Sequence, residues 1–341
     1  MSVKPSILLV YTGGTIGMIK DYETGALKAF DFDQLLENIP ELRLLDCDIS
    51  TSSFKVPIDS SNMNPDYWNE LCSLIASNYD RYQGFVILHG SDTMSYTASA
   101  VSFMLENLNK PVIFTGSQLP IGDLRTDAKE NLITAIQIAA LQKRNKPVVQ
   151  EVCLYFEYKL YRANRTTKVS AEHFEAFDSP NYPPLITSGV HLTVNQELLF
   201  KPRKKTFKVH SNLVTDILLL KMYPGIPERL VLAMLNITNI KGVILETYGS
   251  GNTTTETWFI DALKATIKKG IPVVNVTQCI GGGVQMGNYE TSIALKKIGV
   301  ISGSDITSEA AITKMMYLLG QELGPKVFKS VYETPLRGEL T

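Results

Sequence analysis

Residues 7–17 read ILLVYTGGTIG, and this stretch decides how the rest of the chain is interpreted. The run from Ile7 to Tyr11 is apolar or aromatic throughout, which is typical of a strand buried on both faces of a parallel sheet. The run stops at Thr12-Gly13-Gly14-Thr15, where two glycines permit a tight turn or a close approach to a ligand. Open α/β sheets bind ligands at this end of their strands. A plain glycine turn explains the stretch as well as a ligand site does. A phosphate-binding loop is disfavoured, because neither GxxxxGK[ST] nor GxGxxG is matched.

Composition restricts the function classes. A chain of 341 residues with 44% hydrophobic and 20% charged residues is expected to form two globular domains. The net charge of −1 gives no field that attracts nucleic acid or an anionic membrane. No signal peptide is recognisable, and no apolar run approaches the roughly 20 residues that span a bilayer, so we expect a cytoplasmic protein. Scattered cysteines and histidines favour reduced, buried thiols and give no support for a metal site.

Strand and helix patterns alternate along the chain. Buried runs at 52–57, 85–89, 111–115 and 148–156 alternate with helical stripes at 66–77, around Ala98, Val101, Leu105 and Leu108, and at 123–141. A polar segment at 20–28 is expected to be a mobile loop, and 32–39 a short helix. The alternation resumes after a basic stretch, with strands at 217–223, 243–248 and 272–278 and helices at 227–235, 256–269 and 308–323.

These patterns predict an α/β fold with mainly parallel sheets and right-handed crossovers. We expect a larger N-terminal domain at 1–194, a linker at 195–210 and a smaller C-terminal α/β domain at 211–341. The lysines and arginine of the linker permit contact with nucleic acid, but the neutral overall charge favours a solvated connection.

Polar groups follow three of the predicted strands. They are Thr12 and Thr15, then Asp59, Ser60 and Ser61, and finally Ser91 and Asp92. Because the carboxyl ends of parallel strands lie along one edge, these three turns are expected to share a cleft. No Ser-His-Asp arrangement is recognisable, and His89 inside its strand is expected to be a core residue. A hydroxyl nucleophile would therefore need another base, such as a buried lysine or a tyrosine. Lys168 ends the run YRANRTTK, although a charge run of this kind is usually a solvated face.

The chain resembles the L-asparaginases, and most closely the type I, cytoplasmic, bacterial enzymes. The motifs that carry the resemblance are YTGGTIG at 11–17, VPIDSSNMNPDYW at 56–68, HGSDT at 89–93, LYRANRTTK at 160–168, YGSGN at 248–252, VNVTQC at 274–279 and LRGELT at 336–341. The resemblance implies a hydrolase that converts L-asparagine and water to L-aspartate and ammonia without a metal or cofactor. It also implies a homodimer or a homotetramer built as a dimer of dimers.

Site residues follow from the same resemblance. Thr15 would be the nucleophile that forms an acyl-enzyme, with Ser91, Asp92 and Lys168 as a hydroxyl-lysine-carboxylate relay. Asp92 and residues 59–61 (Asp59, Ser60 and Ser61) would bind the substrate's ammonium and carboxylate groups, while Asn252 and Tyr289 would reach the site from a neighbouring subunit.

The chain departs from the family pattern at three positions. Ser91 stands where threonine is usual, which removes a methyl group that restricts the rotamer. Glu246 stands where an arginine is expected near a possible allosteric asparagine site, and Ala26 stands where a loop tyrosine is expected, so that Tyr22 is the candidate substitute. Two alternatives remain open: an amidotransferase subunit that acts on glutaminyl side chains for tRNA charging, and a non-catalytic asparagine sensor.

Overall fold

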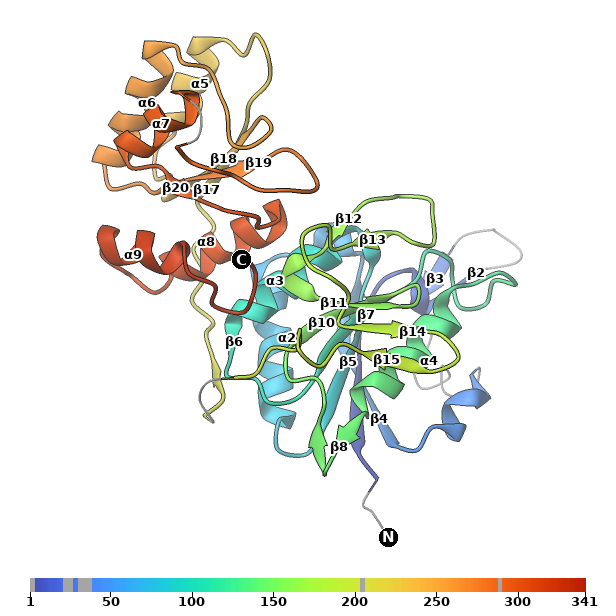
Figure 1. Ribbon diagram of the computed structural model, residues 1–341. Coiled ribbons are helices and arrows are strands. Elements are labelled where there is room, and N and C mark those ends of the chain that lie inside the picture. Colours follow the sequence, from blue (N-terminus) through green and yellow to red (C-terminus); the bar gives the residue numbers. More distant parts are fainter. Residues whose placement is uncertain (1–3, 21–26, 30–38, 203–205, 288–289) are drawn as a thin grey trace. The chain divides into compact units, whose positions relative to one another are not determined.

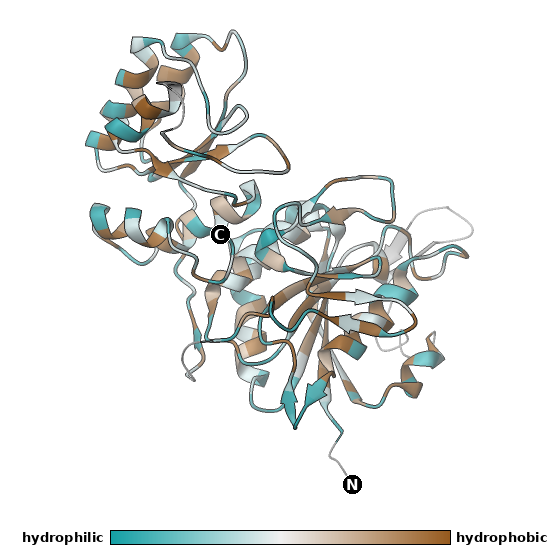
Figure 2. Ribbon diagram, viewed as in Figure 1, coloured by the Kyte–Doolittle hydropathy of each residue, from teal (hydrophilic) through white to brown (hydrophobic). Residues whose placement is uncertain are grey.

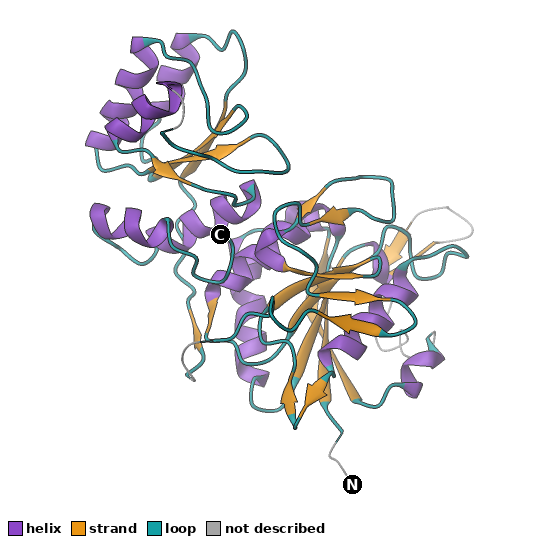
Figure 3. Ribbon diagram, viewed as in Figure 1, coloured by secondary structure: helices purple, strands orange, loops and turns teal. Residues whose placement is uncertain are grey.

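The computed structural model describes residues 4–20, 27–29, 39–202, 206–287 and 290–341, and the chain forms two compact units, 1–211 and 212–341. The predicted helix at 32–39 and most of the predicted loop at 20–28 lie outside the described residues, although β2 (Met18–Lys20) and β3 (Leu27–Ala29) pair as an antiparallel hairpin. Both units have helices packed on mainly parallel sheets (Figures 1 and 3), which confirms the predicted fold class.

The large sheet of the first unit has the strand order β15-β14-β11-β10-β7-β5-β1-β4. Its parallel part contains β1 (Ser6–Gly13), β4 (Asp48–Ile58), β5 (Gly84–Leu88), β7 (Val112–Thr115) and β10 (Val152–Phe156). An antiparallel extension contains β11 (Lys159–Arg162), β14 (Ile186–Ser188) and β15 (Leu192–Val194). The sequence patterns predict the parallel strands and do not predict the extension.

Strand β1 has a central place in this sheet. It pairs in parallel with β4 on one side and with β5 on the other, so that Leu9 lies opposite both Thr51 and Val86. The chain therefore reverses its direction of travel across the sheet at β1, which is the topological switch point where α/β sheets bind ligands. Residues 7–11 of β1 are buried, as the apolar run predicts, and Figure 2 shows hydrophobic residues along the central strands of the sheet.

Helices cover the sheet. They are α2 (Pro65–Asn78), α3 (Met94–Met104) and α4 (Ala128–Ala139). Asn64 caps α2 by accepting a hydrogen bond from the N–H of Asp66 at 2.9 Å. The predicted stripe of α4 is buried against the sheet, with Leu132 and Ile136 in the same core cluster as Ile7 and Leu9.

Two predicted helix boundaries in the first unit are wrong. The stripe through Leu105 and Leu108 overruns α3, because Leu105–Glu106 forms β6 instead, paired antiparallel with β16 (Lys208–Val209), and Asn107 takes a positive φ of 58°. Helix α4 begins at Ala128 and not at 123, because the carboxylate of Asp127 accepts hydrogen bonds from the N–H groups of Gln118 and Leu119 ahead of the helix.

The second unit has a parallel sheet in the order β17 (Ile217–Lys221), β18 (Gly242–Thr247), β19 (Val273–Thr277) and β20 (Ile301–Ser302). Its helices are α5 (Glu228–Leu235), α6 (Thr257–Lys268), α7 (Glu290–Ile298), α8 (Ser308–Leu319) and α9 (Pro325–Tyr332). Three of these elements, β20, α7 and α9, have no counterpart among the predicted ones, and α8 ends before the predicted position 323.

A buried ion pair links α8 to the C-terminal segment of this unit. Lys314 and Glu339 are both 0% exposed and form a salt bridge, while Lys314 Nζ also donates to the carbonyls of Tyr332 at 2.7 Å and Thr334 at 2.9 Å. Burial lowers the pKa of Lys314, and the Glu339 carboxylate opposes that effect. Removing either partner would leave the other charge buried and uncompensated, which strongly destabilises the folded state.

Two further observations concern the whole described chain. The cysteines Cys47, Cys72 and Cys153 are buried free thiols as expected, whereas Cys279 is exposed. In the described parts of the chain no helix is both long and apolar enough to cross a membrane.

Candidate active site

Two glycines bring three strand ends into contact. Gly14 has a φ of +93°, and a Cβ added there would lie 2.5 Å from Gly90 Cα, in the turn after β5. Gly13 has a φ of +133°, and its added Cβ would lie 2.0 Å from the carbonyl oxygen of Ile58, at the end of β4. Only glycine fits at either position, because a side chain would collide with backbone. The turn after β1 therefore lies directly against the turns after β4 and β5.

The two threonines of the first turn have different surroundings. Thr12 is 1% exposed, and its hydroxyl donates to the carbonyl of Leu88 at 2.9 Å, which ties β1 to β5. Thr15 is only partly buried and opens the short 3-10 helix η1 (Thr15–Gly17), immediately beyond the contact of Gly14 with Gly90. Of the two hydroxyls, that of Thr15 is the one open to a ligand.

The turn after β4 has a fixed negative charge. Asp59 caps the 3-10 helix η4 (Ser60–Asn62) by accepting hydrogen bonds from the hydroxyl and the N–H of Ser61, the latter at 2.8 Å. The hydroxyl bond, followed by the N–H bond, lowers the pKa of Asp59. Ser60 is 4% exposed, and its carbonyl accepts from the Thr93 hydroxyl at 2.7 Å, which joins this turn to the one after β5.

A lysine bridges the serine and the aspartate of the third turn. Ser91 and Asp92 lie in η5 (Ser91–Thr93), and Lys168 Nζ donates to Ser91 Oγ at 2.8 Å and to Asp92 Oδ1 at 2.7 Å. The Lys168 side chain is 19% exposed, whereas that of Asp92 is 66% exposed. The carboxylate therefore faces solvent or a ligand, while the lysine is held between the two partners.

Lys168 is positioned by buried charged residues, so the interpretation of residues 161–168 as a solvated face is wrong. Arg162 is 5% exposed and its Nε donates to Glu151 at 2.6 Å. Arg165 is 1% exposed, with its guanidinium 5.1 Å from the ring centroid of Tyr182. The run passes through η6 (Ala163–Arg165) into β12 (Thr167–Lys168), which pairs with β13 (Phe177–Asp178). Each charge is paired or stacked, which allows the run to be buried.

One site residue was not predicted from the sequence. Gln118, beyond the end of β7, accepts a hydrogen bond from Ser91 Oγ at 3.2 Å through its side-chain oxygen. Its side-chain nitrogen donates to the carbonyls of Ala171 at 3.2 Å and His173 at 3.1 Å, in the loop that follows Lys168. The available signal was the polar end of a fourth predicted strand, GSQ at 116–118, which resembles the other strand ends.

The remaining predicted residues lie elsewhere. Tyr22 and Tyr289 are outside the described residues. Asn252 belongs to the second unit, where its carbonyl accepts from the N–H of Tyr248 at 2.9 Å. His89 is a core residue as expected: it is 0% exposed, its Nδ1 lies 2.7 Å from the carbonyl of Gly90, and burial lowers its pKa to about 4. In the described parts of the chain no group of three or more His, Cys, Asp or Glu residues is arranged to hold a metal ion.

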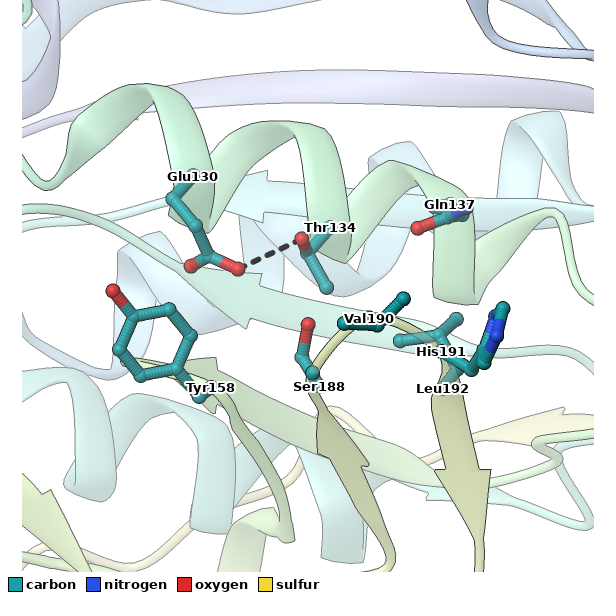
Figure 4. A pocket seen from close by; sticks show the side chains of 9 residues that line it. Glu130, Thr134, Gln137, Tyr158, Ser188, Val190, His191 and Leu192 are labelled. Atoms are coloured by element: carbon teal, nitrogen blue, oxygen red, sulfur yellow. Dashed lines mark hydrogen bonds between the residues drawn. The ribbon is translucent and has the colours of Figure 1, made fainter.

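A separate cavity of about 500 Å³ lies between α4 and the turns after β10 and β14. Figure 4 shows the carboxylate of Glu130 beside Thr134, Tyr158 and Ser188. Glu130 Oε1 accepts from the hydroxyls of Thr134 at 2.9 Å and Tyr155 at 2.6 Å, which explains its place as a structural acceptor. The residues that line this cavity include none of those that surround Lys168.

The turn with the partly buried Thr15, the anionic turn and the lysine held between Ser91 and Asp92 all lie at the switch point of a parallel sheet. This arrangement is typical of amide and ester hydrolases that use a hydroxyl nucleophile. Comparisons with known proteins agree with this class. Residues 6–200 match the family model "Asparaginase, N-terminal", and residues 216–331 match "Glutaminase/Asparaginase C-terminal domain".

Similar proteins cover nearly the whole chain. L-asparaginase 1 of Escherichia coli strain K12 is 43% identical over 339 residues, which are 99% of this chain and 98% of that protein. The crystal structure of L-asparaginase I from Vibrio cholerae is 42% identical with a TM-score of 0.90, covering 99% of this chain and 100% of that one. The human 60 kDa lysophospholipase is 41% identical over 360 residues, which are 98% of this chain and 61% of that protein. The chain therefore belongs to the asparaginase family, and it is an amidohydrolase of the L-asparaginase kind.

Proposed function

We propose that this enzyme hydrolyses L-asparagine to L-aspartate and ammonia, with Thr15 as the nucleophile. The observation that supports this assignment most is the contact of Lys168 Nζ with Ser91 Oγ at 2.8 Å and Asp92 at 2.7 Å, one residue from the point where Gly90 meets Gly14. A hydroxyl is a poor nucleophile until a neighbouring group accepts its proton, and the Asp92 carboxylate stabilises the ammonium that forms when Lys168 accepts it.

The reaction has two steps. The hydroxyl of Thr15 attacks the side-chain amide carbon of asparagine, and backbone N–H groups around the glycine turns stabilise the oxyanion. Collapse of this intermediate breaks the C–N bond: the departing nitrogen takes up the proton that the Thr15 hydroxyl has lost and leaves as ammonia, and an aspartyl ester remains on Thr15. A water molecule then attacks the ester, releases aspartate and restores the hydroxyl. In the relay, Ser91 takes up the Thr15 proton as it passes its own to Lys168 Nζ, Asp92 stabilises the ammonium that results, and the reverse transfer delivers the proton to the departing nitrogen. Such base assistance is worth about 10²–10⁴-fold in rate.

Substrate recognition is assigned to the turns after β4 and β5. The α-ammonium group of asparagine binds Asp92 and the anionic Asp59, whose pKa is lowered by Ser61. The α-carboxylate is assigned to the same turn, at Ser60 and Ser61. Carboxylates for the α-ammonium group, beside a turn that receives the α-carboxylate, would select an α-amino acid over a simple amide.

The proposal extends to assembly and location. We propose a cytoplasmic homo-oligomer, a dimer or a dimer of dimers, in which Asn252 and Tyr289 complete a neighbour's site and Tyr22 closes over the nucleophile. The predicted division into an N-terminal catalytic domain at 1–194, a linker at 195–210 and a C-terminal domain at 211–341 belongs to the same proposal. No metal or cofactor is required by this chemistry.

The test is ammonia release from asparagine, glutamine and β-aspartyl peptides over a concentration series, with and without a chelator. Asparagine turnover that is insensitive to chelation is expected, with Thr15→Ala folded but inactive and Thr15→Ser partly active. Wild-type turnover by Thr15→Ala would refute the nucleophile assignment. Preference for a glutaminyl-tRNA substrate would favour an amidotransferase subunit, and asparagine binding without turnover would favour a sensor.

A further inference from the structure

We propose that Gln118 is a positioning residue for the relay, which holds the Ser91 hydroxyl in the rotamer that contacts Lys168. This inference rests on the proposed role of Ser91, Asp92 and Lys168. Its basis is the set of hydrogen bonds around the Gln118 side chain, which determine where the Ser91 hydrogen points.

The orientation of the Gln118 amide is determined by its partners. Its Nε2 lies 3.2 Å from the carbonyl oxygen of Ala171 and 3.1 Å from that of His173. Carbonyl oxygens only accept hydrogen bonds, so the amide nitrogen must face them and Oε1 must face Ser91. The amide oxygen also only accepts, and the Ser91 hydroxyl is therefore the donor at 3.2 Å.

The direction of the Ser91 hydroxyl follows. With its hydrogen directed at Gln118, Ser91 Oγ offers its lone pairs to Lys168 Nζ at 2.8 Å. The bond to Gln118 is longer than the 2.7–2.8 Å typical of O–H···O bonds. The hydrogen must rotate from Gln118 toward Lys168 before it is transferred, and a bond of this length fixes the position of Oγ while opposing that rotation only weakly.

The backbone of Gln118 is held in place by Asp127. Its backbone N–H donates to both carboxylate oxygens of Asp127, at 2.9 and 3.1 Å, and Asp127 is 6% exposed. Asp127 also accepts from Asn131 at 3.2 Å, on the first turn of α4. The side chain therefore extends from a fixed point to Ser91 and to the loop that follows Lys168.

The need for such a residue comes from serine at position 91. A serine hydroxyl rotates among three staggered positions, whereas the methyl group of threonine restricts this freedom. The Gln118 amide supplies by hydrogen bonding the restriction that a threonine methyl would supply by steric contact. Dependence on Gln118 should then be greatest with serine at position 91 and smaller with threonine.

The experiment measures kcat and KM for asparagine in Gln118→Met, which keeps the length of the side chain and removes its polar atoms. We expect kcat to fall about three- to tenfold, the equivalent of one neutral hydrogen bond, while KM changes less than about twofold. The matched control is Gln137→Met, an exposed glutamine on α4 in the wall of the separate cavity, which should keep wild-type kcat. Melting temperatures check that all variants are folded.

The same substitution in two other backgrounds separates positioning from loop support. In Ser91→Ala there is no hydroxyl to orient, so adding Gln118→Met should cost less than about 1.5-fold in kcat. In Ser91→Thr the added cost should fall below about twofold. Equal losses in all three backgrounds would overturn the proposal, because Gln118 would then act only by holding the loop at 171–173. Wild-type kcat in Gln118→Met would overturn it too.

The single variant Ser91→Ala distinguishes failure of the relay assignment from failure of the Gln118 proposal. If that variant keeps wild-type activity, the relay assignment fails and Gln118 has nothing to position. If it is severely impaired while Gln118→Met is not, the relay stands and only the role of Gln118 is wrong.

Discussion

Gly90→Ala tests whether the contact between the turns sets the geometry of the site. Gly90 has φ −67° and ψ 144°, which alanine adopts without strain, so the substitution acts only through the added methyl group. That methyl carbon would lie 2.5 Å from Ser60 Oγ and 2.8 Å from Ser60 Cβ. Ser60 is 4% exposed and its carbonyl is held by Thr93, so it has no open space into which to move.

The size of the effect follows from these distances. Ordinary contacts begin near 3.4 Å, so Ser60 Cβ must move away by about 0.6 Å, and Oγ in its present rotamer by about 0.9 Å. Overpacking of this kind costs about 1–3 kcal/mol of stability. A misplacement of about 1 Å in a catalytic constellation costs about 10²-fold in rate. We therefore expect kcat/KM for asparagine to fall about 100-fold in a protein that is still folded.

The assay is ammonia release below the melting temperature of every variant, with thermal unfolding followed in parallel. Gly122→Ala is the matched control, because its added Cβ would meet nothing within 4 Å, and it should keep wild-type kcat/KM. A folded Gly90→Ala enzyme within about threefold of wild type would refute the steric argument, as would an equal loss in Gly122→Ala.

Three further outcomes are expected. Lys168→Met and Asp92→Ala should each lower kcat by about 10²–10⁴-fold, and the double variant should be little worse than either, because the two residues act as one unit. Glu339→Gln should lower the unfolding free energy of the C-terminal unit by about 3–5 kcal/mol in urea titrations, since it leaves the buried Lys314 unpaired. Burial, reinforced by nearby carboxylates, raises the pKa of Glu157 from 4.5 to about 7, so the native state keeps a proton that the unfolded chain has released. Stability should therefore fall as the pH rises from 4.5 to about 7, and Glu157→Gln should flatten that slope.

A specific result would contradict each of these three predictions. Multiplying losses in the Lys168 and Asp92 double variant would show that the residues act separately. For Glu339 the control is Glu333→Gln. Glu333 Oε1 lies 3.9 Å from Lys329 Nζ, and the Lys329 side chain is 39% exposed. Loss of this exposed ion pair should change the unfolding free energy by less than about 0.5 kcal/mol. Equal effects at both positions would contradict the role of burial. For Glu157, urea midpoints that shift identically with pH in wild type and Glu157→Gln would show that another group titrates.

The ends of the parallel strands were predictable because the signal is local. A buried strand followed by glycine and hydroxyl residues, as at Tyr11–Thr15 and His89–Asp92, indicates both the element and its functional end. The fold class follows from the repetition of this pattern. The helix after Ser91 was predicted too long, because Leu105 continues the apolar stripe while actually pairing with Val209 in β16, more than a hundred residues further along.

The rest of the site depends on contacts that local patterns do not contain. The sequence alone indicates that the arginines before Lys168 lie on a solvated face. In the structure Glu151 pairs with Arg162, and the ring of Tyr182 lies against Arg165. Gln118 is 27 residues from Ser91 and has no motif of its own. Thr15, Ser91, Asp92 and Lys168 were assigned through resemblance to a family, and their chemical roles stay predictions until the variants are measured.

The position of β1 has a consequence for the production of this enzyme. Residues 7–11 form an uncharged, proline-free segment of high β propensity, which is the composition of an aggregation-prone strand. In the native sheet both of its edges are covered, by residues 48–58 on one side and 84–88 on the other. Until both partners have formed, a refolding chain exposes an unpaired apolar edge to other copies. Recovery of soluble protein from denaturant is therefore expected to depend steeply on protein concentration and to favour dilute, slow refolding.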